Sequence, residues 1–469
     1  MNQVSILLFI LLSVSLFSCQ LAPNYKKPAI ELPDSFDKSY IEKKEVIAQQ
    51  SQWWTKFNDP DLEALITESL NANSDILIAM TNVAQAQAQL NLNNAQRFPQ
   101  INLQGSANRT KNSKQVNSKN NNINHNIVNN FSLASVLNYE IDLWGAAANA
   151  DKAAQALLVS AEENKQAVRQ SVATNTAIAY FNLLALHKQI YLTSHLITIQ
   201  KKIYELNNKL FLAGTSNEID LSQAQSLLTV TESELPILRQ QLQEQKHALE
   251  ILLGRTPKDI VNGSFNHNQT IDKLVAPMVP EILPSKLLEQ RPDIRAAEQN
   301  LIAANSNIGV VRATYFPNLS LTGLLGLGSN KAAKLFNDSA HSWQIGGSSA
   351  MPIIDFGRIK ANVQIAKITQ EQYVIQYRNI VAVAFREVMD ALSAQKTSED
   401  NFNIWQRNEK ALETSARLIK QRQRQGIANY LDVLNAEQSV LQAQISGVTI
   451  KLNRLNAAVN LFHALGGEW

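Results

Sequence analysis

The chain has little cysteine, few aromatic residues and almost no net charge. Its 469 residues include a single cysteine, Cys19, so an internal disulfide is excluded. Aromatic side chains make up 7% of the chain, and the formal net charge of +3 is too small to indicate a nucleic-acid-binding protein. Alanine, glutamine, asparagine and leucine are plentiful instead. This composition favours long helices that pack through small side chains.

The sequence also lacks the common motifs of catalysis and metal binding. Its seven histidines are scattered, without an HExxH motif or a His, Cys and carboxylate cluster at ligand spacing. Neither a glycine-rich phosphate loop nor a nucleophile elbow occurs. We therefore expect neither an enzyme nor a metal or cofactor site.

Long hydrophobic runs are missing except near the N-terminus. The apolar run Val4 to Phe17 is shorter than the roughly 20 residues of a membrane-spanning helix, so it predicts a signal peptide over residues 1–18. Elsewhere, the absence of an 18-residue apolar stretch predicts a mature chain without a transmembrane helix. Cys19 follows directly, and the segment resembles bacterial lipoprotein signals. That resemblance implies cleavage before Cys19 and a covalent lipid on it; a buried or vestigial thiol is the alternative.

The chain repeats itself over about 200 residues. The segment Arg97 to Gly105 recurs as Tyr315 to Gly323, 218 residues later (315 minus 97). Other landmarks recur at a spacing of 212: Trp144-Gly145 with Phe356-Gly357, Gly214 with Gly426, Asp220 with Asp432, and Leu253-Gly254 with Leu465-Gly466. A period this long indicates a domain-scale duplication. We assign residues 59–255 to the first repeat, 256–284 to a linker and 285–469 to the second.

The segment before the first repeat, residues 19–58, is expected to be extended. Its prolines at 23, 28 and 33 exclude regular helix and predict a tether that leads into an equatorial segment. Asp59 is then placed to cap a helix whose first residue is Pro60. A second helix is expected from Ser74 or Asp75 to about Arg97.

Each repeat contains one pair of strand-like segments. They cover residues 100–109 and 129–142 in the first repeat, and residues 317–328 and 342–355 in the second. In 129–142 apolar residues alternate with polar ones, which is typical of a strand with two different faces. The loop Thr110 to Asn130 is rich in Asn, Ser and Lys, and has too little apolar surface to order itself.

A long helix pair follows each pair of strands, over 145–253 and 357–465. The chain should reverse near Leu212 and Gln425, at turns that contain Gly214 and Gly426. Apolar residues in the returning helices step alternately by three and four, which predicts coiled-coil packing. Pro236 should bend the first returning helix. An ordinary soluble helical bundle would show the same heptads.

The four strands are the more informative elements. Each is about ten residues long, the length of a tilted transmembrane β-strand. An open four-stranded sheet in lipid would leave unpaired backbone groups at its edges, and membrane barrels begin at about eight strands. Several chains must therefore contribute to one barrel, and three would give twelve strands. A soluble sheet packed on helices is the competing hypothesis.

One long run of residues and five shorter ones carry a family resemblance. The long run is Arg291-Pro292-Asp293-Ile294-Arg295-Ala296-Ala297-Glu298, continuing through Ala303-Ala304-Asn305 and Ile308-Gly309 to Phe316-Pro317-Asn318-Leu319-Ser320-Leu321-Thr322. The shorter ones are Cys19 to Tyr25, Trp53-Trp54 with Phe57 and Asp59, Tyr139 to Gly145, Phe385 to Val388, and Asn429 to Leu434. Together they resemble the TolC-like outer-membrane efflux proteins, best their lipidated NodT-type branch, which serves RND pumps.

This resemblance implies an α+β membrane protein of the Gram-negative outer membrane. It implies a homotrimer, in which a 12-stranded β-barrel with four strands per chain is continuous with a coiled-coil α-barrel in the periplasm. The partners would be a periplasmic adaptor protein, an inner-membrane RND pump and outer-membrane lipid. The chain would be a passive, gated exit for small toxic compounds. A non-conducting coiled-coil envelope lipoprotein and a metal-ion or polypeptide export duct remain alternatives.

The resemblance also implies site residues at the two reversing turns. Asp432 would form an acidic ring at the periplasmic gate, and Asp220 would pair with Arg422 or Arg424. Leu431 would add an apolar constriction, although a core position explains it equally well. Many relatives carry a second acidic ring where this chain has Asn435. The turns themselves, with Gly214, Thr215, Gly426 and Ile427, would dock the adaptor.

Overall fold

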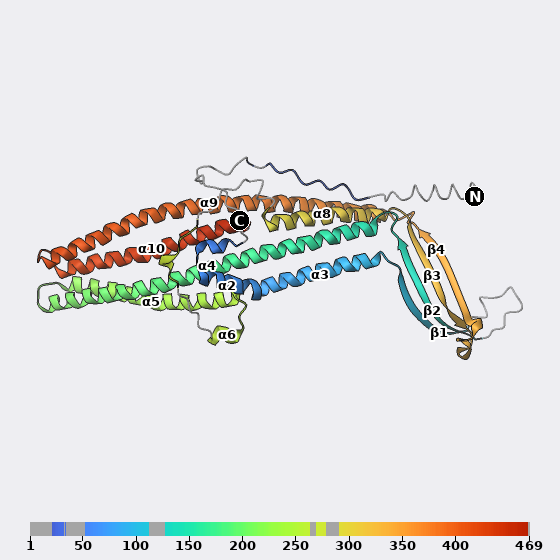
Figure 1. The fold of residues 1–469 in the computed structure, drawn as a ribbon, viewed down its shortest axis with the longest axis horizontal. Helices are drawn as coiled ribbons and strands as arrows, with labels where there is room; N and C mark the ends of the chain where they lie inside the picture. The colour runs from blue at the N-terminus through green and yellow to red at the C-terminus, as the bar shows by residue number, and fades with distance from the viewer. Residues whose placement is uncertain are drawn as a thin grey trace. The chain divides into compact units, whose positions relative to one another are not determined.

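The computed structural model describes residues 21–31, 33, 52–111, 127–262, 269–277 and 290–467. The expected signal peptide and Cys19 lie outside these ranges. The chain combines long helices with one four-stranded sheet, so the α+β class is confirmed (Figure 1). None of the helices in the described ranges has both the length and the apolar character needed to cross a bilayer.

The described chain folds into two compact units. Unit 1 combines the chain up to Pro28 with Val83–Ala161 and Ala297–Tyr377. Unit 2 combines Ala29–Asn82, Glu162–Ala296 and Arg378–Trp469. Each unit therefore takes residues from both predicted repeats.

Unit 1 contains the sheet. Its strands are β1 (Gln100–Thr110), β2 (Val128–Ile141), β3 (Asn318–Ser329) and β4 (His341–Ala350). They pair antiparallel in the order β1-β2-β3-β4. The two hairpins have the same register, because Gln100 opposite Asn138 in the first corresponds to Asn318 opposite Ala350 in the second.

The first three strands lie within one residue of the predicted bounds, whereas the fourth ends early. We expected it to reach residue 355, but β4 stops at Ala350. Ala350 is opposite Asn318, the first residue of β3. Residues 351–355 therefore extend past the end of β3, and their backbone has no strand beside it in this chain.

The sheet has an apolar face and a polar face. The register places Leu137 beside Ile101 on one side and Gly323 on the other, and that face is mostly aliphatic or aromatic. Its large members are Ile101, Leu103, Phe131, Leu133, Leu137, Tyr139, Ile141, Leu319, Leu321, Leu325, Leu327, Trp343 and Ile345. The opposite face carries mainly amides, hydroxyls and small residues, and Glu140 is its one charged side chain within the four strands.

Two helix pairs of equal length follow the two hairpins (Figure 1). The helices α4 (Ala146–Leu212) and α9 (Arg358–Arg424) both have 67 residues. The returning helices α5 (Glu218–Leu252) and α10 (Tyr430–Ala464) both have 35. Helix α5 continues as one element through Pro236, and the bend expected there stays a prediction.

Shorter elements complete the described chain. The connecting helices are α2 (Pro60–Ala72), α3 (Ser74–Gln96) and α8 (Pro292–Ala313). A short helix, α6 (Pro257–Asn262), and four 3₁₀ turns make up the rest: η2 (Trp53–Phe57), η3 (Ile271–Lys273), η4 (Ala332–Lys334) and η5 (Asp338–Ala340).

Aromatic rings and one buried carboxylate form the core of unit 2. Trp53 stacks on Phe462 with the ring centroids 5.6 Å apart, and both side chains are almost fully buried. Asp59 caps α2 as expected, accepting from the backbone N–H groups of Asp61 and Leu62. Its second oxygen accepts a 2.9 Å hydrogen bond from the Tyr180 hydroxyl, and burial, together with the Asp59 charge, raises the pKa of that phenol. The buried charge is thereby satisfied from three donors.

Helices α9 and α10 pack closely around a tryptophan. The Trp405 indole donates a 2.9 Å hydrogen bond to the Ala443 carbonyl, and its ring lies against Gly447. A Cβ atom at Gly447 would lie 2.1 Å from the indole Cζ2 atom. Only glycine therefore fits beside this ring, which is 7% exposed.

Substitution of Gly447 should destabilise this helix pair. In Gly447→Ala the added methyl group must push the held indole out of place, and overpacking of this kind costs about 1–3 kcal/mol. We expect a lower midpoint of heat unfolding in detergent. Ser446→Ala adds the same residue type at the exposed neighbouring position and should leave the midpoint unchanged. Equal midpoints for the two variants would contradict the packing described here.

Candidate functional site

The two reversing turns are built alike. After α4, the Gly214 N–H donates to the Phe211 carbonyl and the Thr215 N–H to the Leu210 carbonyl. After α9, Gly426 and Ile427 make the same two bonds, to Gln423 and Arg422. This is the Schellman pattern, which requires a left-handed residue, and both glycines have it, with φ of 72° and 75°.

The helices that leave these turns begin with equivalent asparagine caps. The Asn217 side chain accepts from the Asp220 N–H at 2.9 Å, and the Asn429 side chain accepts from the Asp432 N–H at 2.7 Å. Each aspartate is thus the third residue of its helix. A carboxylate in the first turn is favoured by the partial positive charge of the helix N-terminus.

The two aspartates differ in what their own oxygens contact. Asp432 accepts a 3.1 Å hydrogen bond from the Asn429 N–H, which completes a capping box. Asp220 instead accepts a 3.1 Å hydrogen bond from the Ser216 hydroxyl. Among the described residues no ion pair joins Asp220 to Arg422 or Arg424, so the expected pairing within one chain is wrong. The nearby serine takes the place of the arginine.

The other gate candidates fall into two environments. Leu431 packs on a cluster of Ile203, Ala224 and Leu434, which joins α4, α5 and α10. The core position that we gave as its alternative is therefore real. Asn435 lies one turn further along α10 and is exposed in this chain. A gate role for either residue stays a prediction.

Apolar side chains are exposed around both turns. Leu212 is 76% exposed at the end of α4, and Ile427 is 62% exposed in the second turn. Ile219 and Tyr430, in the first turns of α5 and α10, are 66% and 50% exposed. Exposed apolar residues gathered at turns are typical of a surface that contacts a partner.

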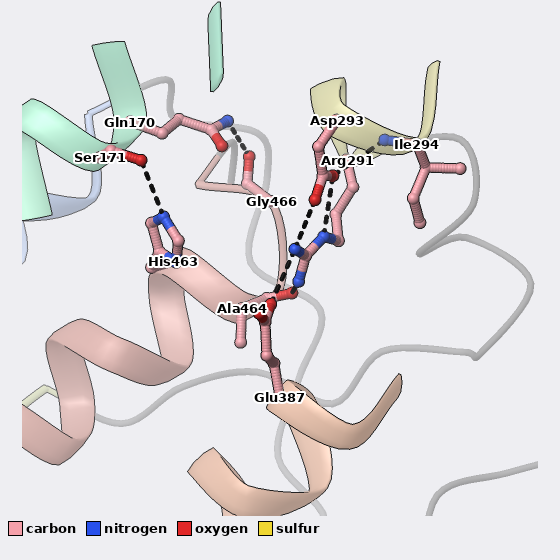
Figure 2. A network of polar contacts seen from close by, with 9 residues as sticks. All are labelled: Gln170, Ser171, Arg291, Asp293, Ile294, Glu387, His463, Ala464 and Gly466. Atoms are coloured by element: carbon pink, nitrogen blue, oxygen red, sulfur yellow. Dashed lines mark hydrogen bonds and ion pairs between the residues drawn. The ribbon is translucent and has the colours of Figure 1, made fainter. Parts of the chain in front are cut away.

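A second group of polar residues lies around Arg291, just before α8 (Figure 2). Its guanidinium is almost buried, donates to both oxygens of Asp293, and donates at 2.9 Å to the Ala464 carbonyl at the end of α10. It also forms a 2.8 Å ion pair with Glu387 of α9. Burial alone would lower the pKa of Arg291, but the two carboxylates raise it, so the guanidinium stays charged.

The same group reaches helix α4. The Gln170 amide donates to the Gly466 carbonyl, and the Ser171 hydroxyl lies 3.4 Å from the His463 ring (Figure 2). Burial, and then the charge of Arg291, lowers the pKa of His463, so the imidazole is neutral at pH 7. The group therefore joins the end of α10 to α4, α8 and α9. It is a structural junction.

Sequence reasoning missed two of these contacts. Arg291 and Asp293 were noticed only as part of a family resemblance, because their partners Glu387 and Ala464 lie far along the chain. Asp272, in the segment expected to be a linker, accepts from Lys188 of α4 and Lys451 of α10 at 2.7 Å each. Nothing in the local sequence around Asp272 indicated this bridge. Within the described ranges, His, Cys, Asp and Glu side chains form no group that could hold a metal ion.

Known proteins support one family for the whole chain. The family model described as "Outer membrane efflux protein" matches residues 65–255 and 283–467. The cation efflux system protein CusC of Escherichia coli is 32% identical over 461 residues, 97% of each chain. The solvent efflux pump outer membrane protein SrpC of Pseudomonas putida is 30% identical over 457 residues, 96% of each.

A solved structure agrees with these matches. The Campylobacter jejuni CmeC outer membrane channel superposes with a TM-score of 0.85 and 29% identity, over 96% of this chain and 95% of that one. The helix pairs, the two-faced sheet and the paired turns are thus the parts of a shared architecture. The chain belongs to the outer membrane efflux protein family.

Proposed function

We propose that three copies of this chain form the outer-membrane exit duct of a tripartite efflux pump. The observation that carries the proposal is the sheet, which is apolar on one face and polar on the other, and whose two outer strands have free edges within the sheet. Three such sheets joined edge to edge give a twelve-stranded barrel with its apolar face toward lipid and its polar face toward water. The duplicated helix pairs would continue the barrel as a periplasmic tube.

The duct is passive, and its partners supply the energy and select the cargo. We infer a periplasmic adaptor that contacts the apolar turns around Leu212 and Ile427, and an inner-membrane RND pump that delivers small toxic compounds. The relatives of similar identity carry different cargo by name, cations for CusC and solvents for SrpC. Cargo choice at the level of the pump accounts for this difference.

The proposed gate lies at the periplasmic mouth, at the start of α10. Three copies of Asp432 would form an acidic ring there, because this carboxylate is exposed and its position is fixed by the capping box. Asn435 would line the next turn as a neutral position. The cap role and the gate role are compatible, since a capping box uses one carboxylate oxygen of Asp432.

The duct itself is tested with purified protein. We expect trimers that dissociate on heating, seen as a band shift between unboiled and boiled gel samples, and ion conductance after insertion into planar bilayers. A monomeric, water-soluble and non-conducting product would exclude the duct. Trimers that stay in the membrane fraction but never conduct would favour the structural envelope lipoprotein instead.

Asn435→Asp tests the neutral position of the gate. A second ring of three carboxylates should strengthen block by multivalent cations, because one opposite charge at 4 Å contributes about 1 kcal/mol in water. The half-blocking concentration should fall several-fold in single-channel recordings. Asn435→Gln keeps the position neutral and should behave like the unmodified protein. An unchanged block in Asn435→Asp would place this residue outside the conduction path.

Cys19→Ser tests the role of the lipid. Several acyl chains make a stable anchor, but the barrel would insert by itself once it is formed. The lipid would then aid delivery more than retention. We expect slower appearance of trimers in a pulse-chase experiment, with all completed trimers in the membrane fraction. Completed trimers in the soluble fraction would show that the lipid is the main anchor.

A further inference from the structure

The junction between β2 and β3 is sealed by a pair of aromatic rings. Trp144 follows β2, and Phe316 precedes β3. Their rings stack with centroids 4.6 Å apart and planes 23° apart. The Trp144 indole also donates a 2.8 Å hydrogen bond to the Pro317 carbonyl. The residue that leaves one strand thus covers the residue that enters the next.

The internal repeat supplies the same two positions a second time, at the outer edges of the sheet. Phe356 stands 212 residues after Trp144 and follows β4, while Phe98 stands 218 residues before Phe316 and precedes β1. Phe356 is 100% exposed and Phe98 is 70% exposed. The second pair of rings is therefore present in the sequence but is not stacked within one chain.

The backbone at Phe356 is unusual as well. Its φ is 53°, in the left-handed region that bulky residues avoid, and the next residue, Gly357, is also left-handed with φ of 87°. A strained backbone that presents a ring wholly to solvent gains nothing in an isolated chain. Such outliers persist where surrounding contacts compensate for them.

The same numbering fixes a register for the missing junction. Ile141 is opposite Leu319, and Tyr139 is opposite Leu321, where β2 meets β3. The repeat offsets convert these pairs to Ile353 with Ile101, and Met351 with Leu103. All four side chains are exposed, at 91%, 68%, 53% and 73% respectively. These pairs lie on the apolar face, and Met351 and Ile353 belong to the segment that we expected to be strand but that has no strand beside it here.

We propose that Phe356 of each chain stacks on the partner's Phe98, and that β4 continues past Ala350 to pair with the partner's β1 with Ile353 opposite the partner's Ile101. This inference rests on the proposed trimer and adds to it the contact residues and the strand register. The occupant of each free edge is a second copy of this chain, because the chain already contains a template of the junction between β2 and β3.

The two kinds of junction would differ in one respect. Phenylalanine has no N–H group, so Phe356 cannot repeat the hydrogen bond that Trp144 makes to a carbonyl. The junction between chains therefore depends on ring stacking and strand pairing. It is the weaker of the two, and subunits should separate there before the sheet of one chain opens.

Cysteine cross-linking tests the ring pair. Phe98→Cys with Phe356→Cys, treated with a short bis-maleimide in assembled protein, should give covalent dimers and trimers on denaturing gels. The matched pair Trp144→Cys with Phe316→Cys should react equally well but stay at monomer size. Phe98→Cys with Phe336→Cys, a ring that is 76% exposed beside the hairpin turn after β3, should not link. Phe356→Cys alone controls for reaction with Cys19.

A second experiment keeps both rings and tests the register. Ile101→Cys with Ile353→Cys should form intersubunit disulfides under mild oxidation, whereas Leu103→Cys with Ile353→Cys is two residues out of register and should form few. Trimers of normal mass without the expected cross-links, or equal linking of the two cysteine pairs, would overturn this inference and leave the duct intact. Monomers with unmodified sequence would overturn the trimer itself, and the inference with it.

Discussion

The backbone groups at the two edges of the sheet are the constraint on which the rest of the structure depends. Each chain pairs its four strands with one another, and the outward N–H and C=O groups of β1 and β4 find no partner in that sheet. In hydrocarbon each unpaired group costs several kcal/mol. Since the apolar face of the sheet favours lipid, the edges must be closed by other copies of the chain. A membrane role and an oligomer are therefore one requirement.

Duplication meets this requirement with a single design used twice. The hairpins share a register, the long helices share a length, and the reversing turns share their hydrogen bonds. Where the repeats diverge, the environment differs. Asp220 bonds Ser216, whereas Asp432 closes a capping box, and Trp144 is stacked whereas Phe356 is exposed. These differences distinguish the six similar positions that three chains would create.

Local patterns in the sequence predicted most of the fold. Alternation located β1 to β3 within one residue, and the glycines at 214 and 426 located both turns because only they adopt the left-handed conformation without strain. The end of β4 was not predictable, since a strand stops where its neighbour does. The Asp220 pairing failed because a serine four residues away competes locally. The Arg291 junction and the Asp272 bridge join positions that are distant in sequence, and composition carries no signal for such contacts.

The polar face of the sheet has a consequence for what the duct could distinguish. Glu140 is the only charged side chain on that face within the strands. A wall made of neutral amides and hydroxyls offers weak, interchangeable contacts to almost any solute. Transit would then depend on size and wetting, and neither an ammonium, a metal ion nor an aromatic solvent would dwell long. Indifference of this kind would let one outlet serve several pumps.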